Sequence, residues 1–143
     1  MDQPSTKDAD YVLDQQVGFI MRQANQRHLA IFARHVPDLT PMQFAALAQL
    51  CALGRVSQNA LGRATAMDAA TIKGVIDRLR RKGYVASAPD PDDQRRVHLT
   101  ATPDGLAAFR TLTPRAHGTT AETLAPLSDA EQADFLRLLS KLI

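Results

Sequence analysis

Residues 57–100 read SQNALGRATAMDAATIKGVIDRLRRKGYVASAPDPDDQRRVHLT, and this stretch decides the fold. Two short helical patterns meet at a tight turn, and two short β-type runs follow around a charged loop. The order helix, turn, helix, strand, loop, strand is that of a winged helix-turn-helix. In such a domain the second helix enters the DNA major groove, and the loop reaches along the backbone or into the minor groove.

Capping residues and glycines mark where these elements begin and end. Ser57 caps a short helix that runs to Ala64, a three-residue turn follows, and Asp68 caps a second helix that Gly83 ends. Four apolar residues form the inward face of this second helix: Ile72, Val75, Ile76 and Leu79.

Two short strands are expected after the second helix, at residues 84–87 and 97–100. Between them, residues 89–96 form a hairpin tip rich in turn residues and charges. The hairpin is the wing of the predicted domain.

Helical patterns flank this stretch on both sides. Apolar residues at three- and four-residue spacing predict one long amphipathic helix over about residues 10–36. A capping box opens an almost wholly apolar helix over residues 40–53, which we expect to be the central buried one. After the strands, helices are expected over about residues 102–120 and, from a second capping box, over 128–143.

The sequence therefore predicts a mainly α protein with six helices and a small β-hairpin wing. We expect one composite domain, with a DNA-binding lobe at residues 37–101 and a dimerisation region made of residues 1–36 and 102–143. The first and last helices carry more apolar side chains than so small a core can cover, which favours an intertwined dimer. The alternative is that these helices pack back on their own chain.

Charge is concentrated in the middle of the chain. The formal net charge is only +2, but residues 54–100 hold nine Lys or Arg against five Asp, a net +4. Each flank, residues 1–53 and 101–143, carries four bases against five acids. This distribution indicates an anionic partner for the middle segment, although a solvated basic surface explains the count equally well.

The composition favours a cytoplasmic protein with no membrane partner. The single cysteine, Cys51, excludes an intramolecular disulfide and suits a reducing compartment. No apolar run approaches membrane-spanning length, and the first ten residues have no signal-peptide pattern.

The expected DNA contacts come from the start of the second helix and from the wing. Short side chains at Asp68, Ala69 and Thr71 let the backbone approach the groove floor, and Lys73 can reach a base edge or a phosphate. We favour a capping role for the Asp68 carboxylate. The full set of expected DNA-binding residues is Ser57, Gln58, Asp68, Ala69, Thr71, Lys73, Arg78, Arg95 and Arg96.

At the hairpin tip, one arginine is expected to be free for the minor groove. Asp92 or Asp93 can pair with Arg95 or Arg96, which would stiffen the tip. We expect Arg95 to be the free side chain, with Arg96 as the alternative.

These motifs together resemble the multiple antibiotic resistance regulator (MarR) family of bacterial transcription factors. The resemblance rests on residues 57–85 followed by DPDDQRRVHLT, with LTPMQFAALAQL before them, and covers nearly the whole chain. It implies a homodimer with two winged-helix lobes on a pseudo-palindromic operator. It also implies a small effector that binds between the dimerisation and DNA-binding lobes and releases the DNA.

The first helix, GFIMRQANQRH at residues 18–28, is similar to members of that family that respond to aromatic acids or their coenzyme A thioesters. A buried carboxylate, thioester carbonyl or phenol would need hydrogen-bond donors such as His28 on the apolar face. A core histidine bonded to the backbone is the alternative. The expected effector-binding residues are Arg22, Gln26, His28, Phe44 and Arg63. A plain core position is favoured over a pocket wall for Phe44, and a salt bridge within the dimer is the alternative for Arg22. The function that follows is a repressor, controlling catabolism of aromatic compounds, that such an effector releases.

Other functional classes fit less well. No metal-ligand cluster, phosphate-binding glycine loop or nucleophile motif is present in the sequence, so we expect neither an enzyme nor a cofactor or metal. Cys51 is expected to be an inert buried thiol rather than a redox sensor. A regulator of drug or oxidative stress responses, or a DNA-binding dimer with no effector, remains the alternative.

Overall fold

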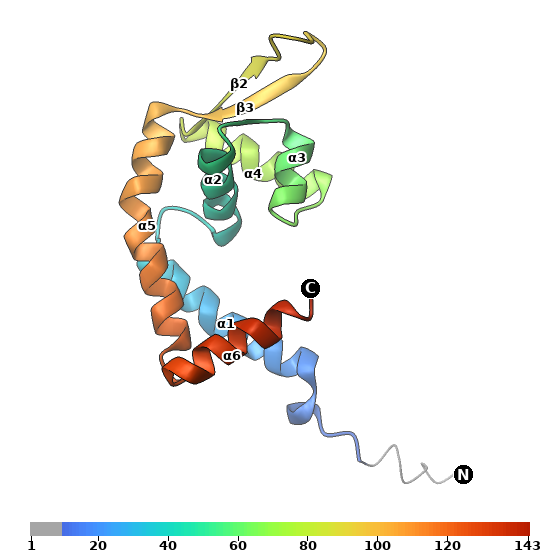
Figure 1. Ribbon diagram of the computed structural model, residues 1–143, viewed down its shortest axis with the longest axis vertical. Coiled ribbons are helices and arrows are strands. Elements are labelled where there is room, and N and C mark those ends of the chain that lie inside the picture. Colours follow the sequence, from blue (N-terminus) through green and yellow to red (C-terminus); the bar gives the residue numbers. More distant parts are fainter. Residues whose placement is uncertain (1–9) are drawn as a thin grey trace, which may run out of the picture.

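The chain, which a computed structural model describes over residues 10–143, folds into a winged-helix lobe above a long helical stem (Figure 1). The lobe holds α2 (Pro41–Leu53), β1 (Arg55–Val56), α3 (Gln58–Ala64), α4 (Ala69–Arg81), β2 (Val85–Pro89) and β3 (Val97–Ala101). The stem consists of α1 (Val17–His35), α5 (Pro103–Leu124) and α6 (Asp129–Ser140). The expected six helices and the wing are confirmed. Residues 1–9 of the expected dimerisation region lie outside the described residues.

The sheet of the lobe has three antiparallel strands in the order β1-β3-β2. Strand β2 pairs with β3 from Val85↔Ala101 to Pro89↔Val97, so the wing is a regular hairpin. The two-residue strand β1, which pairs Arg55 with Thr100, was not predicted because it is too short to show an alternating pattern. It ties the end of α2 to the wing.

The core lies mainly inside the lobe, where α2, α3 and α4 meet the sheet, and it extends into the stem through Phe32 of α1 and Leu112 of α5. Its fully buried side chains are Val36, Leu47, Leu50, Leu61, Ile72, Ile76, Leu79 and Leu99. The inward face of α4 is the one that its sequence pattern predicts, since Ile72, Val75, Ile76 and Leu79 are all buried. Helix α2 is the central buried helix, as expected, and opens with a complete capping box of Thr40 and Gln43.

The lobe is held closely to the stem where α5 begins. The Thr102 hydroxyl caps α5 by accepting from the Gly105 N–H at 3.0 Å and also donates to the Gly83 carbonyl at 2.6 Å. A Cβ added at Gly105 would lie 2.2 Å from the Tyr84 carbonyl oxygen, so only glycine permits this approach. The segment that follows α4 therefore has a fixed attachment to the start of α5.

Two expected helix limits are wrong. The first helix does not run over residues 10–36: Leu13–Gln15 form a 3₁₀ turn, Gln16 is extended, and α1 begins at Val17. The side-chain amide of Gln16 donates to the Val12 carbonyl at 3.0 Å, and this bond favours a break in the helix before Val17. Helix α5 continues beyond residue 120 to Leu124, which is buried.

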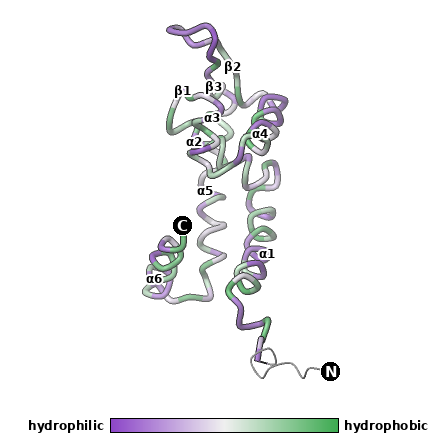
Figure 2. The backbone as a smooth tube through the Cα atoms, turned by 90° about the vertical axis from the view of Figure 1, so that its right-hand side faces the viewer, coloured by the Kyte–Doolittle hydropathy of each residue, from purple (hydrophilic) through white to green (hydrophobic). Residues whose placement is uncertain are grey.

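Helices α1 and α5 pack along each other, whereas α6 stands away from α1 (Figure 2). No residue of α6 is buried by the described part of the chain. Phe135, Leu138, Leu139 and Leu142 are all exposed. The stem thus presents an uncovered apolar face.

Candidate DNA interface and effector cavity

The helix-turn-helix is built by two N-terminal caps. Ser57 accepts from the Ala60 N–H at 3.2 Å, and Asp68 accepts from the Thr71 N–H at 2.7 Å. The latter bond holds the pKa of the Asp68 carboxyl below its usual range. The expected capping role of Asp68 is confirmed. Its direct contact with DNA stays a prediction.

The exposed side of α4 carries both cations and a carboxylate. Lys73 and Arg80 each lie 3.1 Å from Asp77, whereas Arg78 is exposed. Lys82 donates to the Asp38 carbonyl at 3.0 Å and so joins the end of α4 to the loop before α2. Lys73 and Arg78 are exposed on this side of α4, and their contact with DNA stays a prediction. Lys82 has a structural bond instead.

The hairpin tip is organised by its acidic residues. Asp90 accepts from the Asp92 N–H at 2.9 Å and lies 2.7 Å from His98 Nε2, and these two contacts hold the pKa of the Asp90 carboxyl below its usual range. Asp93 accepts from the Arg95 N–H at 3.0 Å and lies 3.8 Å from the Arg96 guanidinium. The Arg95 guanidinium has no hydrogen-bond or ion-pair partner among residues 10–143. The geometry matches the expected pairing, which leaves Arg95 free.

A basic groove lies between the start of α3 and the strand β3 of the wing. It is lined by Arg55, Val56, Ser57, Gln58, Asn59, Arg63, Arg96, Val97 and His98. Three guanidinium groups and several amide and hydroxyl groups are the donors that phosphate oxygens need. Arg55 and Asn59 were missed in the sequence, because β1 could not be recognised and nothing else placed them beside the wing.

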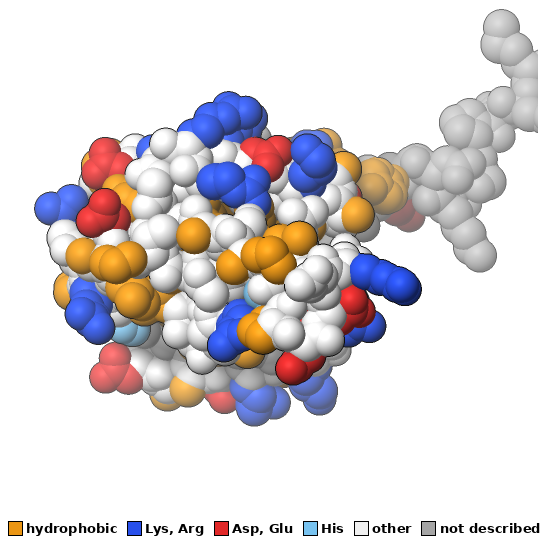
Figure 3. All heavy atoms as spheres, turned by 90° about the horizontal axis from the view of Figure 1, so that it is seen from above, with side chains coloured by type: hydrophobic (Ala, Val, Ile, Leu, Met, Phe, Trp, Pro, Cys, Tyr) orange, Lys and Arg blue, Asp and Glu red, His pale blue; other side chains and the backbone are white. Residues whose placement is uncertain are grey.

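Positive charge on the wing end is divided among several clusters. Viewed from above, Lys and Arg side chains lie at the rim and near the middle, with acidic and apolar groups between them (Figure 3). Such a surface contacts a polyanion at separate points.

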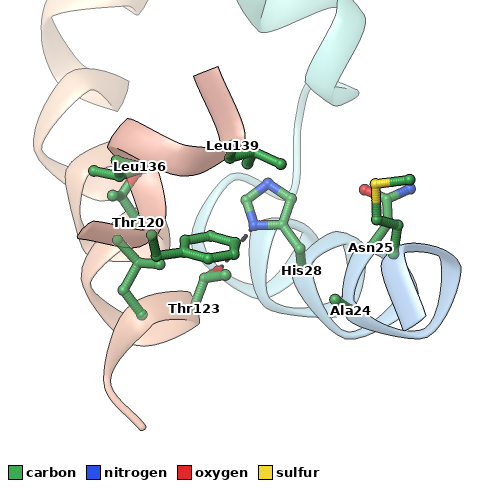
Figure 4. Close-up of a pocket in the computed structure, with 10 residues that line it drawn as sticks. Ala24, Asn25, His28, Thr120, Thr123, Leu136 and Leu139 are labelled. Carbon is green, nitrogen blue, oxygen red and sulfur yellow. Dashed lines mark hydrogen bonds between the residues drawn. The ribbon is translucent and has the colours of Figure 1, made fainter. Parts of the chain in front are cut away.

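An apolar cavity of about 370 Å³ lies in the stem between α1, α5 and α6. Its lining residues are Met21, Ala24, Asn25, His28, Thr120, Thr123, Leu124, Phe135, Leu136 and Leu139. His28 points from α1 toward Thr123, and Leu136 and Leu139 face the same space from α6 (Figure 4). The cavity thus combines apolar walls with a few convergent polar groups, which is typical of small-molecule sites.

His28 is the expected effector residue that the structure brings to this cavity. Its Nδ1 lies 2.9 Å from the Thr123 hydroxyl, so it bonds a side chain and not the backbone. Thr123 belongs to a segment that the sequence pattern assigned to a loop after the fifth helix, which is why it was missed.

The other four expected effector residues lie elsewhere. Arg63 is in the basic groove, and Phe44 packs in the core between Phe32 and Phe109, with ring centroids 6.2 and 5.8 Å away. Arg22 lies over the Phe19 ring at 5.5 Å, and Gln26 is exposed. One chain therefore does not assemble the expected set, and effector contacts by these four residues stay predictions.

Next to the cavity, α1 is clamped to the end of α5 by polar contacts. Arg27 donates to the carbonyls of Glu122 and Thr123 at 3.1 and 2.8 Å. The Glu122 carboxylate lies 3.0 Å from Arg34 and 3.2 Å from His35, and first Arg34 and then His35 hold the pKa of Glu122 below its usual range. Because Thr123 is the next residue, the clamp and the cavity share one turn of α5.

Residues 10–143 contain no group of three or more His, Cys, Asp or Glu side chains placed to hold a metal ion. None of their helices has the length and apolar character that crossing a membrane requires.

The lobe, its capped helix-turn-helix and its basic wing define a winged-helix DNA-binding protein. The model of the family described as "MarR family" matches residues 38–96. The chain is 38% identical over 135 residues to the HTH-type transcriptional repressor NicR of Pseudomonas putida, covering 93% of this chain and 85% of that protein. The chain belongs to the MarR family, whose members are DNA-binding transcription regulators and not enzymes.

Two solved structures are similar along most of the chain. A probable transcriptional regulator from Pseudomonas aeruginosa is 48% identical, with a TM-score of 0.90 over 92% of this chain and 100% of that one. Bordetella bronchiseptica BpsR is 40% identical, with a TM-score of 0.88 over 92% of this chain and 96% of that one. The BpsR structure concerns regulation of its DNA binding by 6-hydroxynicotinic acid.

Proposed function

We propose that this chain is a repressor that binds a pseudo-palindromic operator as a homodimer and is released by a small aromatic acid. The observation that carries the proposal is the largely apolar stem cavity, in which His28 of α1 and Thr123 of α5 form a hydrogen-bonded polar pair. The likeness to BpsR, whose DNA binding responds to 6-hydroxynicotinic acid, supports the same chemical class of effector. A role in aromatic-compound catabolism follows from that class, and a regulator acting on chromosomal DNA works in the cytoplasm.

The size of the cavity favours a free aromatic acid over its coenzyme A thioester. Small-molecule sites range from about 300 to 1,000 Å³, and the stem cavity, at about 370 Å³, lies near the lower limit. A one-ring acid fits such a space, while a thioester would have to leave its nucleotide outside. Arg27 and Arg34, two bases near the cavity, are already bonded to α5 and are poor candidates for its phosphates.

The operator is expected to mirror the dimer. Two lobes related by a two-fold axis place their α4 helices in successive major grooves, about one helical turn apart. Each lobe contributes the first turn of α4 to base edges and its basic groove and wing to the backbone.

The test is a gel shift on the DNA next to the gene for this chain, with 6-hydroxynicotinic acid, hydroxybenzoates and their coenzyme A thioesters added in turn. We expect release by one or more free acids, accompanied by a rise in Tm of the protein. No release and no rise in Tm with any of them would exclude this effector class. A footprint without two-fold symmetry would contradict the dimer-operator arrangement.

The second candidate function is regulation of the oxidative stress response, and the properties of Cys51 do not favour it. Burial raises the pKa of the Cys51 thiol, with a smaller opposing effect of Arg110. Because the thiolate is the reactive form, this half-buried thiol is poorly suited to sensing. If the protein instead regulates drug responses, or binds DNA without an effector, none of the aromatic acids or thioesters should release the DNA in the gel shift.

A further inference from the structure

Along the exposed edge of α4, three side chains form a continuous chain of polar contacts that ends on the wing. Lys73 Nζ lies 3.1 Å from Asp77 Oδ2, and Arg80 Nη1 lies 3.1 Å from Asp77 Oδ1. The other guanidinium arm, Arg80 Nη2, donates to the Ser87 hydroxyl on β2 at 2.5 Å. This chain of contacts thus runs from Lys73 in the first half of α4 to Ser87 on β2, the first strand of the wing.

This arrangement differs from an isolated surface ion pair. A single exposed pair contributes little to stability. Here both oxygens of one carboxylate are occupied, and Asp77 is only 35% exposed. Lys73 and then Arg80 hold the pKa of Asp77 below its usual range, so it stays charged. The planar guanidinium of Arg80 fixes the direction of both its bonds, and therefore the distance between α4 and β2.

A carboxylate on this face repels DNA phosphates of any sequence. Left unpaired, Lys73 and Arg80 would add two mobile cations and strengthen binding to all duplexes alike. Asp77 therefore lowers non-specific affinity and holds both cations at fixed positions. Specificity is the difference between two affinities, so both effects increase it.

We propose that Asp77 is a positioning residue for DNA recognition, which fixes Lys73 at the groove edge and, through Arg80 and Ser87, sets the wing relative to the recognition helix. The wing and α4 then read the operator as one unit. The inference rests on the DNA-binding function and adds a specificity determinant to it.

The experiment measures affinity for two duplexes over a range of salt concentrations. One is an operator selected from a random pool by the wild-type protein, and the other is an unrelated duplex of equal length. For Asp77→Asn we expect tighter non-specific binding, a salt slope steeper by about one to two, and a specificity ratio lower by about tenfold. For Ser87→Ala, which changes no charge, we expect an unchanged slope and a ratio lower by several-fold.

Two further variants separate positioning from simple charge. Asp92→Asn also removes a charge near DNA but lies outside the chain of contacts, so it should strengthen binding to both duplexes equally. The double variant Asp77→Asn, Ser87→Ala should lose little more specificity than Asp77→Asn alone, because both substitutions break the same series of contacts. Thermal unfolding of each variant verifies that it is folded.

The outcomes decide between the claims. A specificity ratio that stays within twofold of wild type in both single variants overturns the inference, as does an equal change for both duplexes in Asp77→Asn. If the wild-type protein selects no sequence from the pool, the regulatory function fails and the inference fails with it. A selective wild type with unaffected variants refutes the positioning role alone.

Discussion

We expect the bond between His28 and Thr123 to determine what the stem cavity recognises. His28 comes from α1 and Thr123 from α5, both line a largely apolar space, and their hydrogen bond is 2.9 Å long. A ligand carboxylate or phenol can take the place of either partner, whereas an apolar ligand that separated them would leave both unpaired. The cavity is therefore suited to a polar aromatic molecule.

Thr123→Val keeps the shape of this side chain and removes its hydroxyl. We expect operator binding to be retained, and the concentration of 6-hydroxynicotinic acid needed for release to rise by about 5- to 100-fold, as for a lost hydrogen bond in a buried site. Gel-shift titrations measure it, with Thr111→Val on the exposed side of α5 as the matched control. Equal responses of the two variants would show that the Thr123 hydroxyl has no part in effector binding.

Glu122 makes the joint between α1 and α5 dependent on pH. Its pKa is lowered in the folded protein, mainly by Arg34, so the charged form stabilises the fold. This contribution is complete above the ordinary glutamate pKa of 4.5 and is lost as the pH falls through the lower folded value. The pairing thus matters at neutral pH and disappears in acid.

Glu122→Gln should accordingly lower the Tm at pH 7, and the difference from wild type should shrink as the pH is lowered below about 4. Thermal unfolding at several pH values measures this convergence. The double variant Glu122→Gln, Arg34→Met should lose little more than Glu122→Gln alone, since one ion pair is removed in both. A difference in Tm that is constant across pH would mean that the Glu122 charge does not stabilise the joint.

At the scale of elements, the tip of the wing is stiffened by internal contacts and presents one arginine that is free for DNA. The Asp90 N–H donates to the Arg96 carbonyl at 2.9 Å, and His98 lies against the Asp90 carboxylate. Arg96 also approaches Asp93, while the Arg95 guanidinium extends without a partner in the described chain. The two neighbouring arginines should therefore act differently on DNA.

Arg95→Ala should weaken operator binding and reduce the salt slope by about one, because one phosphate-region contact is lost. Arg96→Ala should reduce affinity less, since that guanidinium is partly neutralised by Asp93. Affinities at four or more salt concentrations provide both numbers. Unchanged slopes in both variants would mean that the hairpin does not reach DNA, and a larger effect of Arg96→Ala would reverse the assignment of the tip residue.

Local signals in the sequence predicted the lobe well. Caps such as Asp68 and turn residues such as Gly83 act within a few residues, so helix starts and the wing could be placed from sequence alone. The errors occur where distant contacts decide. Arg27 binds the last carbonyls of α5 from 95 residues away, and this helps the helix to continue to Leu124. The groove position of Arg63 likewise depends on how β3 lies beside α3.

For the whole molecule, the uncovered face of the stem is the main structural argument for a dimer. A second apolar hollow adjoins the cavity, and it is bounded by Val17, Ile20 and Met21 of α1, by Leu138 of α6 and by Leu142 just beyond α6. Contiguous exposed apolar surface of this kind is unusual on a monomer. A second copy of the same face would cover it and close the effector cavity from solvent. Dimerisation and effector binding are therefore expected to depend on each other.

Leu138→Glu tests this dependence without disturbing the fold of a single chain, since Leu138 is 51% exposed. Leu53→Glu, at a side chain that is 50% exposed on α2, is the matched control for the oligomeric state. We expect Leu138→Glu to sediment as a monomer, to bind operator DNA at least tenfold more weakly because one lobe replaces two, and to lose its rise in Tm with aromatic acids. The wild-type protein and Leu53→Glu should sediment as dimers whose Tm increases with protein concentration. A monomeric wild type would mean that α6 packs on its own chain in solution and that the operator is read by separate lobes. A Leu138→Glu variant that remains dimeric would mean that this face of the stem does not hold the dimer together.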